Sequence, residues 1–181
     1  MAAWSVVGGG YSKFYRATGE LLFGSFKDGG VVRFSQSADN KDNTNIIAYN
    51  RFCTDKNGEM SRNGYYHNTR TGDYMYTVFL AALILAAPLS LKRKVLAIVL
   101  GFILMQVFVI FHIAIIVIKL LSDAPVSLLI LTPRWKDTAA AALIISNHVT
   151  TGFIVAFFIW ILVSFRQQNW AEFVIQKKTK G

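Results

Sequence analysis

Three long apolar segments dominate the second half of the chain. They cover residues 74–91, 95–118 and 139–165, and none of them contains Lys, Arg, Asp or Glu. An α-helix rises about 1.5 Å per residue, so about 20 apolar residues cross the hydrocarbon core of a bilayer. The pattern therefore predicts a membrane α-helical protein in which residues 74–165 form a domain of three transmembrane helices.

In front of these segments, apolar residues recur at every second position. Two glycine-containing turns, at residues 28–30 and 55–58, separate short alternating runs, and glycine favours such turns because it accepts positive φ. Residues 21–73 are therefore predicted to form a small antiparallel β domain of about four strands. Four short strands enclose only a small hydrophobic core, so we expect this domain to pack against the membrane or another protein.

The two ends of the chain carry amphipathic patterns. In residues 1–20, aromatic and apolar side chains recur at three- and four-residue steps, interrupted by Gly8-Gly9-Gly10. We expect an interfacial helix or part of a membrane helix there, with an ordinary amphipathic helix packed on the β domain as the alternative. Residues 166–181 mix aromatic and basic side chains and are expected to form a basic tail on the cytoplasmic leaflet.

The distribution of charge predicts an orientation. The chain has a net charge of +9 with 16% charged and 54% hydrophobic residues, and the turn at residues 92–94 is purely basic. Positive charge is retained in the cytoplasm, so this turn and the C-terminus are predicted to be cytoplasmic and residues 21–73 extracytoplasmic. Met1–Gly10 is too short for a signal peptide. A leading helix ahead of residue 1, direct translocation and an inverted topology all remain open.

Basic and aromatic residues near the ends of the segments are expected at the lipid interface, where a ring can be apolar on one side and hydrogen-bonded on the other. Lysines beside membrane helices favour anionic lipid headgroups over nucleic acid as a partner. The predicted interfacial residues are Trp4, Tyr74, Tyr76, Arg93, Lys94, Arg166 and Trp170.

Polar side chains inside apolar segments are costly and generally face protein or water. The second segment contains His112 and the third contains His148. Such groups join helices or contact a partner subunit. The alternative is a haem or a metal ion bound by the two histidines. The residues expected to contact a partner are Ser146, Asn147, Thr150, Thr151, Trp135 and Arg70.

Cysteine and motif content argue against an enzyme. Cys53 is the only cysteine in the sequence, so no intrachain disulfide forms, and we interpret it as a half-buried strand residue. A nucleophilic role, with His67 as base and Arg51 as oxyanion partner, has no supporting motif. The sequence also contains no phosphate-binding glycine loop and no HExxH motif. We therefore expect a non-catalytic protein.

The segment Thr69-Arg70-Thr71-Gly72-Asp73-Tyr74 leads into a helix that ends in Ala86-Ala87-Pro88, followed by the basic turn. With this order, residues 4–110 resemble small membrane proteins encoded alongside exosortases, the bacterial membrane transpeptidases that sort proteins at the cell envelope. The resemblance implies an accessory role in a bacterial inner membrane and carries no catalytic residues. The chain departs from exosortases themselves because Cys, Arg and His do not follow one another at membrane helix ends.

The predicted function is a non-catalytic accessory or structural subunit of a multi-subunit membrane complex. Its helices would pack against partner subunits, and its β domain would lie outside the cytoplasm. A haem- or metal-binding membrane anchor that uses His112 and His148 is the alternative function.

Overall fold

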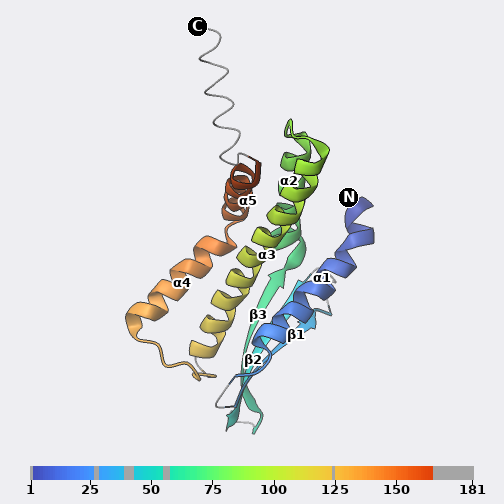
Figure 1. Ribbon diagram of the computed structural model, residues 1–181. Coiled ribbons are helices and arrows are strands. Elements are labelled where there is room, and N and C mark those ends of the chain that lie inside the picture. Colours follow the sequence, from blue (N-terminus) through green and yellow to red (C-terminus); the bar gives the residue numbers. More distant parts are fainter. Residues whose placement is uncertain (1, 27–28, 39–42, 55–57, 124, 165–181) are drawn as a thin grey trace.

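The computed structural model describes residues 2–26, 29–38, 43–54, 58–123 and 125–164, with the side chains of residues 2–8 excepted. These residues form five α-helices, a short π-helical turn and one antiparallel sheet of three strands. Helix α3 (Leu91–Ser122) is the central element, and two groups of elements pack along it (Figure 1).

The first group is the sheet and the N-terminal helix, which pack on the C-terminal half of α3. The sheet has the strand order β1 (Gly30–Gln36), β2 (Asn43–Thr54), β3 (Met60–Asn68). Side chains along β1 and the first part of β2 are alternately buried, as expected for a sheet with one covered face. Helix α1 (Ala2–Phe23) lies beside the sheet. The shared core includes Tyr15, Val32, Phe34, Ile46, Ala48, Val109, Ile113, Ile116, Val117 and Leu121.

The sheet has fewer strands than the four predicted. Residues 22 and 23 belong to α1, and the expected first strand is reduced to an isolated bridge between Ser25 and Val31. Gly29 and Gly58 adopt positive φ values of 79° and 80°, as the turn interpretation requires. Residues 27–28, 39–42 and 55–57 of the connections lie outside the described part of the chain.

The second group packs on the N-terminal half of α3. It consists of α2 (Met75–Ala86) and α5 (Val149–Ser164), and its core includes Tyr76, Leu80, Ile84, Ala97, Met105, Ala156 and Ile159. Gly152 allows α5 to approach α2 closely, because a Cβ atom there would overlap the ring of Tyr76. The two helices that flank α3 are therefore fixed by apolar contacts.

The prediction of three transmembrane helices is wrong. Among the described residues, α3 is the one helix that is by itself long and apolar enough to cross a membrane. Helix α2 has 12 residues, which is about 18 Å of helix and too short to cross. The third segment is divided between α4 (Pro133–Asn147) and α5, and these two helices meet at a bend of 75°.

Pro88 and a local hydrogen bond explain why the first and third apolar segments do not form continuous transmembrane helices. Pro88 restricts the residue before it, and Ala87 is extended with φ −65° and ψ 141°, so α2 ends there. At the other break, His148 is extended with φ −68° and ψ 125°. The hydroxyl of Thr151 donates to the carbonyl of Ile145 at 2.6 Å, which provides an alternative to a continuous helical ladder. The polar cluster of the third segment thus marks a bend.

Candidate functional site

Three titratable side chains from different elements meet in the interior of the protein. His67 comes from the end of β3, Asp73 from the π-helical turn η2 (Arg70–Tyr74), and His112 from α3. Their exposed fractions are 5%, 0% and 2%. We call these three residues the His–Asp–His centre. A buried carboxylate is unusual enough to require an explanation.

The groups in the centre are close enough to interact directly. His67 Nε2 lies 2.6 Å from Asp73 Oδ2. The rings of His67 and His112 meet edge to face, with centroids 5.1 Å apart. One potential ligand atom from each of the three residues lies within 4.8 Å of the other two. The centre can therefore share a proton between imidazole and carboxylate, and its donor atoms also suit a divalent transition-metal ion.

The turn that carries Asp73 is shaped by two local features. Asn68 Oδ1 accepts hydrogen bonds from the backbone N–H groups of Arg70 and Thr71, at 3.1 and 3.2 Å. Gly72 lies against the imidazole of His67, and a Cβ atom there would come within 2.5 Å of the ring. Glycine is thus required for the approach of the ring to the backbone. A single π-helical turn is often found at a functional site.

Helix α1 covers one side of the centre. The ring of Tyr15 stacks on His67 with centroids 5.3 Å apart, and the hydroxyls of Ser12 and Thr69 are hydrogen-bonded at 2.8 Å. Burial, and then the nearby charge of Asp73, raises the pKa of Tyr15 well above its ordinary value. The phenol is therefore neutral at physiological pH and shields the centre from water.

Asn147 connects the centre to the bend between α4 and α5. Its Oδ1 atom accepts a hydrogen bond from His112 Nε2 at 3.0 Å, and its Nδ2 atom donates to the hydroxyl of Tyr65 at 2.5 Å. Burial raises the pKa of Tyr65 as well. The amide therefore ties the bend to both α3 and β3, and it orients the ring of His112.

Some buried polar atoms in and beside the centre have no hydrogen-bond partner among the described residues. They include Asp73 Oδ1 and the hydroxyl oxygen of Tyr15. Leaving a buried polar atom unpaired costs about 1–3 kcal/mol. The hydrogen-bonding capacity of the centre is therefore not used up by the described part of the chain.

Sequence reasoning identified only one member of the centre. His112 was a candidate ligand, but His148 is exposed at the break between α4 and α5 and does not belong to the centre. His67 was considered only as a base for Cys53, and Asp73 was not a candidate, since β3 and η2 bring the two residues to α3 only in the folded chain. The sequence offered one hint of the site: Asp73 follows Gly72 directly and stands just before the apolar segment that begins at residue 74.

Several other predicted residues have defined positions. The hydroxyl of Ser146 donates to the carbonyl of Leu143, Thr150 and Trp135 are exposed, and Arg70 is half-buried in η2. Of the predicted interfacial residues, Tyr76 is instead buried in the core, and Tyr74 is half-buried with its ring against Tyr11. Arg93 is exposed and Lys94 Nζ donates to the carbonyl of Leu85. The side chain of Trp4, and Arg166 and Trp170, lie outside the described residues.

Cys53 and His67 do not come together. Cys53 is exposed near the end of β2 where Thr54 pairs with Met60. His67 pairs with Thr44 at the opposite end of the same ladder. Two side chains separated in this way cannot form a nucleophile–base pair.

Comparison of the chain with protein-family models, with curated proteins and with solved structures gives no match. The resemblance to exosortase-associated proteins therefore stays a prediction.

Proposed function

We propose that the chain is a non-catalytic subunit of a membrane assembly, held in the bilayer by α3 and by the helices packed on its N-terminal half. The observation that carries this proposal is a belt of exposed apolar side chains around α2, α3 and α5. The belt includes Val78, Leu85, Val95, Leu96, Val99, Phe102, Ile103, Leu104, Val107, Ile154, Phe157, Phe158 and Leu162. An exposed apolar surface of this extent is typical of a membrane or protein contact.

The dimensions of α3 support a membrane position for the belt. Within the apolar window of this helix, 44% is buried in the protein, less than expected for the core helix of a soluble domain. The uncharged part of α3, residues 95–118, forms about 36 Å of helix, which is long enough to cross the hydrocarbon core. The sheet and α1 pack on its C-terminal half, so its N-terminal half is the part with most apolar surface free for lipid contact.

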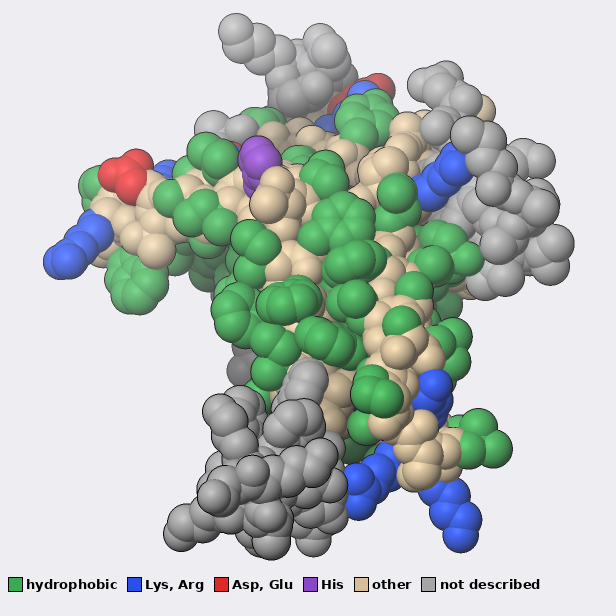
Figure 2. Space-filling model, turned by 90° about the horizontal axis from the view of Figure 1, so that it is seen from above, with side chains coloured by type: hydrophobic (Ala, Val, Ile, Leu, Met, Phe, Trp, Pro, Cys, Tyr) green, Lys and Arg blue, Asp and Glu red, His purple; other side chains and the backbone are tan. Residues whose placement is uncertain are grey.

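The face seen in Figure 2 agrees with this position. Apolar side chains form a nearly continuous surface across it, and Lys and Arg side chains lie at its margins. Basic residues at the edge of an apolar surface are typical of proteins that contact anionic lipid headgroups. This distribution favours lipid as the surrounding medium.

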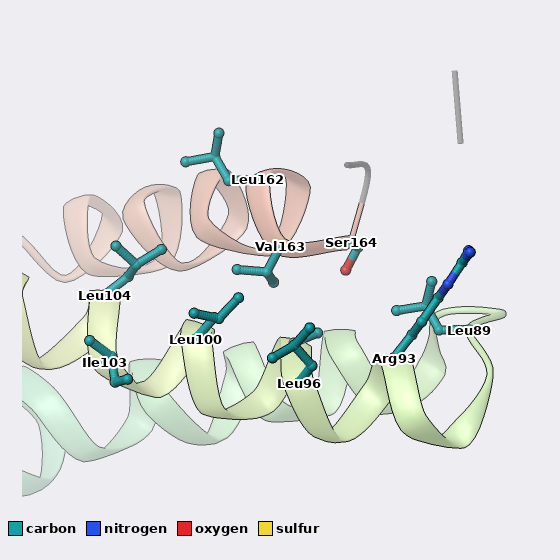
Figure 3. A pocket seen from close by; sticks show the side chains of 10 residues that line it. Leu89, Arg93, Leu96, Leu100, Ile103, Leu104, Leu162, Val163 and Ser164 are labelled. Carbon is teal, nitrogen blue, oxygen red and sulfur yellow. The ribbon is translucent and has the colours of Figure 1, made fainter. Parts of the chain in front are cut away.

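A groove between α3 and α5 supports the role of a subunit (Figure 3). It has a volume of about 430 Å³, and Leu96, Leu100 and Leu104 of α3 line it together with Leu162 of α5. Arg93 lies at the end of the groove, near Ser164. We place a helix of a partner subunit here, because membrane helices associate through close apolar packing.

The orientation follows from the same elements. We place the basic turn at residues 92–94 in the cytoplasm, in accordance with the positive-inside rule. The sheet packs on the other end of α3 and would therefore lie outside the cytoplasm. Ser164 of α5 lies beside the start of α3, and we therefore place this end of α5 on the cytoplasmic side as well. A bacterial inner membrane is proposed from the resemblance described above.

A pair of substitutions at exposed apolar residues tests the belt. Val99 lies in it and is 50% exposed, whereas Leu21, at the end of α1, is 85% exposed outside it. A charge at the centre of a membrane helix costs about 3 kcal/mol. Val99→Glu should therefore release the chain from membranes during carbonate extraction, and Leu21→Glu should leave it in the pellet. Equal behaviour of the two variants would argue against the belt.

The subunit role is tested on the gently solubilised chain. Native mass spectrometry after purification through a C-terminal tag is expected to show a fixed stoichiometry with another membrane protein. Leu162→Glu, in the groove, should reduce that stoichiometry. A monodisperse lone chain from native membranes would contradict the subunit role.

A further inference from the structure

We propose that the His–Asp–His centre binds one divalent transition-metal ion of the Zn²⁺ or Co²⁺ class through His67, Asp73 and His112. This inference is independent of the proposed function, since it depends on the geometry of the interior and not on the membrane.

The spacing of the donor atoms fits such an ion. Zinc–nitrogen and zinc–oxygen bonds of about 2.0–2.1 Å in a tetrahedral site put the donor atoms about 3.3 Å from one another. The three potential ligand atoms lie within 4.8 Å of one another, and His67 Nε2 and Asp73 Oδ2 are 2.6 Å apart. The required separation lies between this distance and the 4.8 Å limit, so modest side-chain shifts would bring the donor atoms into position.

The state of Asp73 is the second observation that points to a cation. Its side chain is fully buried, its Oδ1 atom has no hydrogen-bond partner among the described residues, and its Oδ2 atom pairs with the imidazole of His67, which carries a positive charge only when it is protonated. A buried carboxylate is stable only when a positive charge or several hydrogen bonds compensate it. A divalent ion supplies that charge and provides a partner for the carboxylate.

The surroundings of the histidines resemble the outer shell of a metal site. Histidine ligands generally donate their second ring N–H to an oxygen acceptor, which fixes the ring and its tautomer. Asn147 Oδ1 accepts from His112 Nε2, so Nδ1 of that ring is the atom left with a lone pair. Asn147 is itself exposed, so the hydrogen-bond partner of His112 reaches solvent.

Binding requires the loss of one proton. Starting from an imidazolium–carboxylate pair, the proton between His67 Nε2 and Asp73 Oδ2 passes to solvent and Nδ1 of His67 keeps its hydrogen. The neutral ring and the carboxylate then bind the ion through their lone pairs. Two imidazoles and a carboxylate make a donor set for Zn²⁺ or Co²⁺, and a fourth position is left for water.

The test uses Co²⁺ as a spectroscopic probe. The full chain is purified in detergent, treated with chelator and titrated with Co²⁺, with Zn²⁺ as competitor. One equivalent of Co²⁺ should give visible d–d absorption of tetrahedral intensity, and Zn²⁺ should displace it. Asp73→Asn and His67→Gln should weaken binding by more than about 100-fold, beyond the ~10–100-fold expected for the outer-shell variant Asn147→Ala.

The control is His148→Gln, which changes an exposed histidine outside the centre. It should bind Co²⁺ as the unmodified chain does. If the variants of the His–Asp–His centre do not fold, the Co²⁺ titration of the unmodified chain and of His148→Gln tests the proposal. Absence of d–d absorption there, or binding that His148→Gln abolishes, would overturn the proposal.

Discussion

His67 and Asp73 are six residues apart in the chain, and their side chains meet with 2.6 Å between Nε2 and Oδ2 in an interior almost closed to solvent. The end of β3 supplies the histidine, and the π-helical turn after it supplies the carboxylate. Because His112 of α3 lies against the same histidine, this pair adds a polar contact to the apolar core that the sheet shares with the central helix. Its removal should lower the stability of the fold.

The substitution Asp73→Asn tests how much the buried pair contributes. Breaking a buried ion pair leaves the other partner uncompensated and costs about 3 kcal/mol or more. We expect the free energy of unfolding to fall by this amount when it is measured by denaturant titration of the detergent-solubilised chain in the presence of chelator.

Asp123→Asn is the matched control for this measurement. Asp123 pairs with Lys119 at 2.9 Å, but both side chains are more than one-third exposed. Exposed pairs contribute about 0–1 kcal/mol, so this variant should be nearly as stable as the unmodified chain. Equal losses in the two aspartate variants would show that the buried pair has no special role.

Gly72→Ala tests the close approach of His67 to the backbone. The added methyl group would meet the imidazole, and forced overpacking of this kind costs about 1–3 kcal/mol. Gly64, on β3, has open space at the corresponding position, so Gly64→Ala should change stability by less than about 0.5 kcal/mol. Thermal unfolding of the two variants checks this, and a stable Gly72→Ala chain would contradict the observed packing.

Tyr15 is expected to make the folded protein less stable as the pH rises above 10. The unfolded chain releases the phenol proton near pH 10, whereas the folded chain holds it to a higher pH because burial raises the pKa. The folded state therefore has full stability below pH 10 and loses up to about 1.4 kcal/mol per pH unit above it.

Tyr15→Phe removes the contribution of this phenol while keeping the ring that stacks on His67. Its stability at pH 7 should rise by about 1–3 kcal/mol, because the buried hydroxyl that it removes has no hydrogen-bond partner among the described residues. The decline between pH 10 and 11.5 should become shallower. An unchanged slope would show that Tyr15 is not the group responsible.

The sequence predicted elements better than it predicted their ends. The apolar run at residues 95–118 lies within α3, and the alternating runs from residue 31 onward correspond to strands. The helix ends at Ala86 and Asn147 were missed, because apolar composition continues through Pro88 and His148 while the backbone turns there. Hydropathy reports the environment of a segment, and backbone hydrogen bonding decides whether it is one helix.

The site was harder to predict than the fold. No local spacing links His67 and Asp73 to His112, since the contact depends on how β3 packs on α3. His148 has the same residue type at a similar position in its segment, but the bend after Asn147 leaves it exposed. The neighbouring amide binds His112 instead. Buried polar clusters of this kind are determined by tertiary packing, which a single sequence does not display.

The most direct test of the proposed membrane position asks on which side of the membrane Cys53, the one native cysteine, lies. Cys53 is exposed on β2, and Ser90, just before α3, is exposed at the other end of that helix. In sealed spheroplasts, a membrane-impermeant maleimide should label Cys53, and it should label a Cys53→Ser, Ser90→Cys chain only after detergent is added. Labelling of both positions without detergent, or the reverse order, would contradict a central helix that crosses the membrane with the sheet on the outer side.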